Sequence, residues 1–308
     1  MVQISEVASG LLFPEGPIAM PDGSVIVVEI ARGTLTRIQP DGSKEIVAET
    51  GGGPNGAAVG PDGKIYVCNN GGFAWHERNG ELWPGGQPDD YSGGRIEKID
   101  PDTGEVEVLY REVDGNRLRG PNDLVFDRSG GFWFTDRGKT RRRDRDRGGV
   151  YYARADGSLI KEVVFGTEGS NGIGLSADEN HLFVAETITG RLWKYQIVGE
   201  GEIRKDNRAR IPGELVIGLP GMKLLDSLAI DSRGYVCVAT LVDEPGINSI
   251  APDGSTIEFM GFDDPLPTNI CFGGKDLKTA YVTLSASGRL VRCTWPVAGL
   301  PLNFLNNR

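Results

Sequence analysis

Short apolar segments that directly follow tight turns recur along the whole chain. Each contains three to five consecutive apolar or aromatic residues after a turn with Gly, Asp or Asn. The six segments are residues 24–29, 64–69, 132–136, 181–186, 235–239 and 279–283. Apolar runs of this length, bounded by these turn residues, predict antiparallel strands joined by tight turns.

A second pattern stands before each turn. A short phrase, such as PNGAAVG or PNDLVFD, recurs at residues 14–20, 54–60, 121–127, 170–176, 225–231 and 268–274. Its second position always carries an oxygen-bearing side chain, and we call these six residues the column. They are Glu15, Asn55, Asn122, Asn171, Asp226 and Asn269. Successive column residues are 40 to 67 residues apart, about 51 on average, which falls in the range of β-propeller repeats.

A third apolar segment and a second turn complete most of the repeats. They occur at residues 33–43, 93–104, 148–158 and 247–255. The order strand, turn, strand, loop, strand, turn, strand describes one four-stranded blade. The sequence therefore predicts an all-β fold, a six-bladed β-propeller of four-stranded antiparallel blades around a central tunnel. We expect residues 1–308 to form one domain, with the segment 3–9 supplying the outer strand of the last blade.

The repeat also predicts which parts of the chain share an end of the tunnel. If each phrase is the innermost strand of its blade, the column residues lie at one end and the turns at the other. Loops that follow the second strands return to the column end. Two of them are long, residues 70–94 and 137–149, and we call them the roof. Long loops on a rigid scaffold are common binding sites.

Composition narrows the partners and the compartment. The chain has 308 residues, including 45 Gly and 18 Pro, and a formal net charge of −10, which argues against nucleic acid or an anionic membrane surface as partner. No apolar run reaches membrane-spanning length, and the N-terminus has no export signal. The four cysteines stand singly, as free thiols do in a reducing cytosol. We expect a cytoplasmic protein, and nothing in the sequence indicates its oligomeric state.

The column has the chemistry of a metal site. Carboxylate and amide oxygens that converge on one axis suit a hard divalent cation. Two other interpretations stay open at this point. Asn and Asp side chains also bind nearby backbone groups at strand entrances, and a purely structural ion or water could fill the propeller axis.

Other catalytic arrangements find little support. The chain has no G-x-S-x-G elbow and no P-loop signature, and its two histidines cannot form a His-rich zinc site. We expect His181, which follows a turn, to be structural, whereas His76 lies in a roof loop beside Trp75. The arginine-rich run 141–147 is either a self-neutralising solvated loop or a site for a carboxylate-bearing substrate. A further polar set ends the second strands of blades one to four, and we expect it to be structural or supporting. It comprises Glu29, Asn69, Asp136 and Glu186.

Several stretches together resemble the senescence marker protein and gluconolactonase family, the regucalcin-like six-bladed propellers. They are FPEGP from Phe13, GPNDLVFD and FWFTD from Gly120, SNGIGLSADENHLFVAET from Ser170, LDSLAIDSRG from Leu225 and TNICFGGKDLKTAYVT from Thr268. The resemblance implies a divalent-metal hydrolase whose ion is held by a glutamate, one or two asparagines and an aspartate. By position these residues are Glu15, Asn122, Asn171 and Asp226.

The chain departs from the family pattern in two places. Regucalcin-type lactonases have an arginine two residues before the blade-three asparagine, where this chain has Gly120, with Arg119 one place earlier. Similar propellers of the diisopropylfluorophosphatase type have a histidine in blade six, and this chain has none there. These differences make lactone hydrolysis in general a firmer expectation than a sugar lactone, and phosphotriester hydrolysis the runner-up.

We therefore predict a metal-dependent hydrolase of a lactone or related cyclic ester, such as a sugar lactone or a similar small carboxylated lactone. Asp226 is the expected general base, and Asn122 is expected to bind both ion and substrate. The other expected substrate-binding residues are Asn55, Asn269, Arg119, Phe73, Trp75 and His76. Calcium suits an oxygen-only shell best, with zinc, manganese or magnesium as alternatives. A non-catalytic ligand-binding propeller with a structural ion is the alternative from another class.

Overall fold

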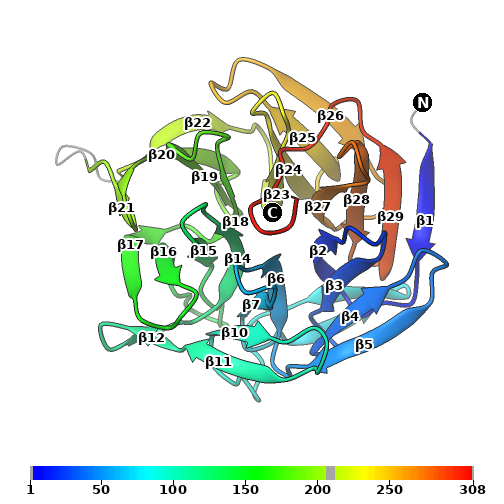
Figure 1. The fold of residues 1–308 in the computed structure, drawn as a ribbon, viewed down its shortest axis with the longest axis horizontal. Coiled ribbons are helices and arrows are strands. Elements are labelled where there is room, and N and C mark those ends of the chain that lie inside the picture. The colour runs from blue at the N-terminus through cyan, green and yellow to red at the C-terminus, as the bar shows by residue number, and fades with distance from the viewer. Residues whose placement is uncertain (1–2, 206–211, 307–308) are drawn as a thin grey trace.

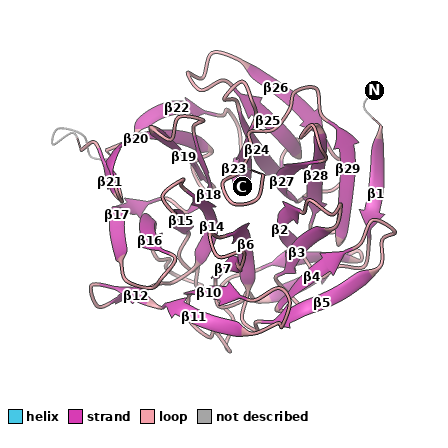
Figure 2. Ribbon diagram, in the orientation of Figure 1, coloured by secondary structure: helices cyan, strands magenta, loops and turns pink. Residues whose placement is uncertain are grey.

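The strands of the protein form a ring of antiparallel blades around a central tunnel (Figure 1). The structure is a computed structural model that describes residues 3–205 and 212–306. In these ranges the regular secondary structure consists of β-strands (Figure 2). The predicted all-β, six-bladed propeller is confirmed.

The first three blades follow one another along the chain. Blade one contains β2 (Pro14–Ala19), β3 (Val25–Glu29), β4 (Thr34–Ile38) and β5 (Lys44–Glu49). Blade two contains β6 (Pro54–Val59), β7 (Ile65–Asn69), β10 (Arg95–Ile99) and β11 (Val106–Tyr110). Blade three contains β14 (Pro121–Phe126), β15 (Gly131–Asp136), β16 (Gly148–Arg154) and β17 (Ile160–Thr167). Two short hairpins stand apart, β8 (Trp75–Arg78) with β9 (Glu81–Pro84) and β12 (Glu112–Val113) with β13 (Asn116–Arg117).

The last three blades complete the ring. Blade four contains β18 (Ser170–Leu175), β19 (His181–Glu186), β20 (Arg191–Gly199) and β22 (Glu214–Gly218), with β21 (Glu202–Ile203) also paired to β20. Blade five contains β23 (Lys223–Ile230), β24 (Val236–Val242), β25 (Gly246–Ile250) and β26 (Ile257–Gly261). Blade six contains β27 (Pro267–Gly273), β28 (Thr279–Leu284), β29 (Arg289–Thr294) and β1 (Ile4–Ala8).

The ring closes through strands from the two halves of the chain. The innermost strands contact one another in the order β2, β6, β14, β18, β23 and β27, and β27 contacts β2 again. The N-terminal strand β1 pairs with β29, with Ile4 opposite Cys293 and Ser5 opposite Arg292. This pairing covers the outer edge of β29, which would otherwise expose unpaired backbone groups. The assignment of residues 1–308 to one domain stays a prediction.

Burial explains why each strand has its sequence. Strand β3, VIVVE, is buried throughout, because blade faces on both sides cover it. The outer strand β5, KEIVAE, is mostly exposed and carries charged residues. Between blades two and three, the rings of Tyr66 and Phe126 lie 5.0 Å apart and those of Tyr66 and Phe132 lie 5.8 Å apart. Such aromatic contacts stabilise the blades against each other.

The roof loops lie across the column end and contact each other. The backbone N–H of Gln87 donates to the Thr140 carbonyl at 2.8 Å. Lys139 is buried, and its Nζ donates to Asn70 Oδ1 at 2.9 Å and to the Gly72 carbonyl. The β8–β9 hairpin reaches blade six, where the N–H of Leu82 donates to the Ala286 carbonyl at 2.9 Å. The roof is therefore an ordered structure.

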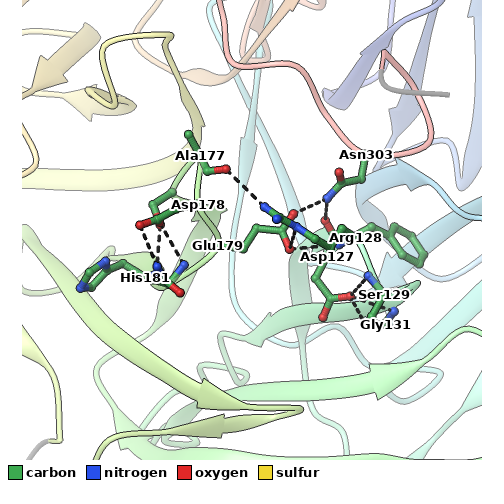
Figure 3. A network of polar contacts seen from close by, with 12 residues as sticks. Asp127, Arg128, Ser129, Gly131, Ala177, Asp178, Glu179, His181 and Asn303 are labelled. Carbon is green, nitrogen blue, oxygen red and sulfur yellow. Dashed lines mark hydrogen bonds and ion pairs between the residues drawn. The ribbon is translucent and has the colours of Figure 1, made fainter.

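The opposite end of the tunnel, which we call the base, holds the turns that follow the innermost strands and the C-terminal segment 299–306. The N–H of Leu300 donates to the Ile230 carbonyl at 2.8 Å. Asn303 Nδ2 donates to the Phe126 carbonyl at 3.1 Å and to Glu179 Oε1 at 2.7 Å, which joins the turns of blades three and four (Figure 3). His181 also lies at this end, as predicted (Figure 3).

The structure also bears on the cysteines and on membrane-spanning helices. All four cysteines are buried free thiols, as their spacing predicted. Among the residues that the structure describes, no helix is long and apolar enough to span a bilayer.

Candidate active site

The column residues lie at irregularities in the innermost strands. In every blade the pairing between the innermost and second strands shifts by one residue close to the column position. In blade three, for example, Pro121 pairs with Asp136 and Leu124 with Phe134, so Asn122 and Asp123 lie in the shift. A β-bulge turns a side chain out of the regular pleat. The bulges thus explain how residues in the middle of a sheet point toward the tunnel.

Glycine lets the innermost strands approach one another beside the column. A Cβ on Gly16 would lie 2.5 Å from the Asn55 carbonyl oxygen, and one on Gly172 would lie 2.6 Å from the Asp226 carbonyl oxygen. Gly56 has the same relation to Asn122, again at 2.6 Å. Side chains cannot occupy such space. At these three contacts, therefore, the backbones of neighbouring blades touch directly.

The polar residues that end the second strands hold the segments entering the column. Glu29 accepts from the N–H of Leu12 at 2.7 Å, and Asn69 accepts from the N–H of Gly53 at 2.9 Å. In blade three, Asp136 accepts from the N–H groups of both residues before Pro121, each at 2.7 Å. Glu186 accepts from the N–H of Glu168 at 2.9 Å. These four residues position the column from behind, in line with the supporting role predicted for them.

Direct contacts join parts of the column. Asn269 Nδ2 donates to Glu15 Oε2 at 2.7 Å, across the junction of blades six and one. Asn171 Nδ2 donates to Thr187 Oγ1 at 3.0 Å, which directs the Asn171 amide oxygen away from that hydroxyl. The Oδ1 atom of Asn122 is buried and accepts no hydrogen bond within the described residues. A buried amide oxygen without a partner is costly unless something else binds it.

The carboxylates of the column repel one another in a dry environment. Burial raises the pKa of Glu15 well above its usual range, and the charges of Asp226 and Asp123 raise it further. Burial also raises the pKa of Asp226, although the positive charge of Arg137 opposes the rise. Asp123, next to Asn122, has its pKa raised to about 7, mainly by burial. Asp123 is not among the predicted site residues, because the third position of the phrase varies between copies.

These observations fit a bound cation. A positive ion would offset the repulsion between Glu15 and Asp226 and would give Asn122 Oδ1 a partner. Within the described ranges, no three His, Cys, Asp or Glu side chains are placed to share an ion. A site here must therefore combine the two carboxylates with amide oxygens, which is the composition of the predicted set Glu15, Asn122, Asn171 and Asp226.

The remaining predicted residues lie at different distances from the column. Asn55 is buried in its own bulge, next to Gly16. Phe73 and Trp75 are half-buried in the roof, with ring centroids 5.9 Å apart, and both pack on the core of blade one. His76 is exposed on β8, and Arg119 is exposed in the strand entrance of blade three. No hydrogen bond or ion pair among the described residues joins either of these two side chains to the column.

The arginine-rich run of the second roof loop is neutralised in part, by its own aspartates and by Glu168, which lies between β17 and β18. Arg141 binds Asp144 at 2.5 Å and Asp146 at 2.9 Å, while Arg145 and Arg147 both bind Glu168. These ion pairs support the interpretation of a self-neutralising loop.

A cavity of about 300 Å³ lies below the column, between it and the C-terminal segment. Asp123 and Asn269 line its upper part, and Phe126, Ile230 and Leu302 line its lower part. The column thus separates an apolar chamber from the roof.

Fold and site together define a class: a six-bladed β-propeller with buried carboxylates and amides on its axis, under two long loops. The chain belongs to the SMP-30/Gluconolactonase/LRE-like region family, whose profile matches residues 13–286. It is 28% identical over 318 residues to the gluconolactonase of Zymomonas mobilis, an alignment that covers 94% of this chain and 80% of that protein. It is 29% identical over 228 residues to the lactonase drp35 of Staphylococcus haemolyticus, covering 73% of this chain and 62% of that protein.

Solved structures show the same fold. A gluconolactonase from Xanthomonas campestris superposes with a TM-score of 0.74 at 18% identity, covering 96% of this chain and 90% of that one. Regucalcin from Agrobacterium tumefaciens, a calcium-binding protein, superposes with a TM-score of 0.69 at 19% identity, covering 95% and 94%. At this identity the superpositions establish the shared propeller.

Proposed function

We propose that the protein hydrolyses a lactone at the column, with a divalent cation held by Glu15, Asn122, Asn171 and Asp226. The observation that carries the proposal is the buried Asn122 Oδ1, which accepts no hydrogen bond from the described residues, in the same column as two carboxylates whose pKa values are raised. The names of the related proteins, a gluconolactonase and a lactonase, support the same reaction. The oxygen-only donor set favours calcium over zinc, manganese or magnesium.

When bound there, a divalent cation supplies Lewis-acid polarisation of the lactone carbonyl. The residues of the chain supply the positioning and the proton transfers. Glu15 and Asn171 hold the ion, and Asn269 fixes the Glu15 carboxylate through its 2.7 Å hydrogen bond. Asn122 contributes its amide oxygen to the ion and binds a substrate oxygen through its Nδ2 donor. Asn55 and Asn269, which are not among the proposed ligands, close the ring of polar side chains around the ion.

Asp226 acts as the general base. One of its carboxylate oxygens accepts a proton from a water molecule while the water oxygen bonds to the lactone carbonyl carbon. The ring C–O bond then breaks, and Asp226 returns the proton to the departing alkoxide oxygen, which yields a hydroxy acid. The opposing effects of burial and Arg137 on the pKa of Asp226 keep its carboxylate basic enough to accept a proton and still ionised near neutral pH.

The roof is the proposed determinant of substrate shape. Phe73 and Trp75 present aromatic faces above blade one, and their rings are fixed by mutual contact and by Phe13, whose ring lies 5.0 Å from Trp75. His76 and Arg119 border this region and are exposed to solvent. The substrate is therefore a small molecule that enters from the roof side.

The test combines elemental analysis with an activity screen. Protein purified without chelator is analysed for Ca, Zn, Mn and Mg, and is then assayed with a pH indicator on a panel of lactones and one phosphotriester. We expect about one divalent cation per chain and lactone hydrolysis that a chelator abolishes. A faster rate on the phosphotriester would favour the runner-up activity. Bound cation without hydrolysis of any substrate would identify the ion as structural and the proposal as wrong.

A further inference from the structure

Arg137, the first residue of the second roof loop, lies beside the strand entrances of blades three and four. Its backbone N–H donates to the Gly120 carbonyl at 2.9 Å, which fixes it beside the entrance of β14. Its side chain passes over Gly169, where an added Cβ would lie 3.7 Å from Arg137 Cγ. From there its charge acts on Asp226 in blade five. The side chain thus extends from blade three across blade four toward the proposed base.

The guanidinium of Arg137 is unpaired within the part of the chain that the structure describes. Among the described residues, no hydrogen bond and no ion pair within 4.0 Å involves its nitrogens, whereas Arg141, Arg145 and Arg147 of the same loop are all paired with carboxylates. The side chain is only half-buried, so a ligand can reach it. The planar guanidinium of Arg137 thus holds five N–H donors at the tunnel mouth, and none of them has an acceptor among the described residues.

Further positive charge surrounds this guanidinium. The charge of Arg145 acts on Arg137, and burial, together with the charge of Arg137, lowers the pKa of Lys139 to about 7. Crowding of like charges is unfavourable and is relieved when an anion binds among them. The loop 137–149 carries seven Arg and Lys residues against two Asp, in a chain whose formal net charge is −10.

We propose that Arg137 binds a carboxylate carried by the substrate, so that the natural substrate is an anionic lactone. The inference rests on the proposed lactonase function and adds to it the chemical class of the substrate. A guanidinium binds a carboxylate through two parallel hydrogen bonds, which orient the lactone as well as hold it. Arg137 takes this role in a chain whose Arg119 is exposed to solvent and makes no such approach to the column.

The test compares two lactones that differ only in charge. One is a five-membered lactone with a carboxymethyl substituent, and the other carries the corresponding carboxamide. We expect wild-type protein to prefer the carboxylate, and Arg137→Gln to lower kcat/KM for the carboxylate about 100-fold, mainly through KM, because a charge-assisted bidentate contact is lost. The carboxamide should change less than threefold. Arg142→Gln, an exposed arginine of the same loop, is the matched control and should leave both substrates unchanged.

Two results would overturn the inference. Equal losses on both lactones in Arg137→Gln would mean that Arg137 acts through Asp226, and a wild-type protein indifferent to the carboxylate would mean that no such subsite exists. Arg137→Lys keeps the charge without the fork and should lie between wild type and Arg137→Gln. It also serves as the second variant if Arg137→Gln fails to fold.

A binding measurement separates this inference from the proposed function. If neither lactone is hydrolysed, the lactonase proposal fails, and calorimetric titration with the open-chain hydroxy dicarboxylate still tests Arg137. Binding to wild type that weakens at least tenfold in Arg137→Gln supports the carboxylate subsite. Equal binding by the two proteins, or no binding to either, rejects it.

Discussion

The two ends of the tunnel place the same kind of side chain in opposite environments. At the column end, burial raises the pKa values of Glu15 and Asp226, and the charge of Asp226 raises that of Glu15 further. At the base, the turn aspartates accept hydrogen bonds from residues two positions away. The Ser24 hydroxyl and N–H lower the pKa of Asp22, and the Ser176 hydroxyl and Asn180 lower that of Asp178 to about 2.

The carboxylates at the two ends differ in where their hydrogen-bond donors lie in the chain. A turn aspartate finds its donors within its own turn, so folding satisfies it locally. A column carboxylate also depends on a donor across the ring: besides the N–H of Gly16, Glu15 accepts a hydrogen bond from Asn269, 254 residues further along the chain. The base carboxylates are therefore stable as anions by themselves, whereas the column carboxylates need a positive charge. The carboxylates with raised pKa values mark the candidate site.

The most direct test of this comparison is to replace an aspartate by asparagine at each end of the tunnel. We expect Asp226→Asn to lower kcat for lactone hydrolysis about 1,000-fold, because the amide cannot accept the proton from water. Asp178→Asn, at the base, should keep activity within about twofold. Initial rates at saturating lactone measure both, with bound cation quantified in each variant. Full activity in Asp226→Asn with its cation retained would exclude Asp226 as the base.

The pH dependence of stability should also have opposite signs at the two ends. A carboxyl whose folded pKa is raised to about 7, as for Asp123, stabilises the fold fully below about pH 4, and this contribution is lost as pH rises toward 7. The loss for Asp123 is on the order of 4 kcal/mol in cation-free protein.

Urea unfolding in chelator between pH 3 and 8 measures this effect. Asp123→Asn should lack most of the decline that wild type shows between pH 4 and 7. The lowered pKa of Asp178 has the reverse consequence: its contribution is present above about pH 4 and is lost as pH falls toward 2. If the Asp123→Asn curve runs parallel to wild type throughout, the carboxyl of Asp123 is not buried as described.

Cation removal should destabilise the column end alone. At a calcium concentration 100 times its dissociation constant, binding stabilises the fold by about 2.7 kcal/mol, so a chelator should lower the wild-type Tm by roughly 5 °C. Glu15→Gln should abolish the response, because one charged ligand is lost. Asp22→Asn, at the base, should retain it. Differential scanning calorimetry with and without calcium makes the comparison, and a chelator-insensitive wild type would contradict the proposed site.

The smallest expected effect on stability comes from adding one methyl group to a glycine of an innermost strand. Gly172→Ala places a Cβ 2.6 Å from the Asp226 carbonyl oxygen, so the two strands must separate, at a cost of about 1–3 kcal/mol. In the outer strand of the same blade, Gly218→Ala meets nothing closer than 3.7 Å and should change stability by less than about 0.5 kcal/mol. Chemical denaturation measures both, and equal effects would show that the ring tolerates widening.

The sequence predicted the fold and the alignment of the column, because both depend on local rules. Turn residues and apolar runs recur with the blade, and register follows once each strand faces the core. The sequence did not predict residues whose role depends on contacts with distant parts of the chain. Lys139 reads as one cation among many in its loop, yet its Nζ binds Asn70, 69 residues earlier. Arg137 stands out because its unpaired side chain is half-buried, whereas Arg142 and Arg143 of the same loop are exposed, and no spacing in the sequence reveals this difference.

The direct backbone contacts at Gly16, Gly56 and Gly172 have a consequence for ion preference. Where main chains touch, the circumference of the innermost ring is set by backbone atoms, and all six blades share it. Replacing one column side chain changes the charge and the ligand atom at that position, but it leaves the diameter of the innermost ring unchanged. Selection between a large ion such as calcium and a small one such as magnesium is then a property of the packing between blades. We expect substitutions that change the preference between calcium and magnesium to lie at these contacts between blades, outside the column itself.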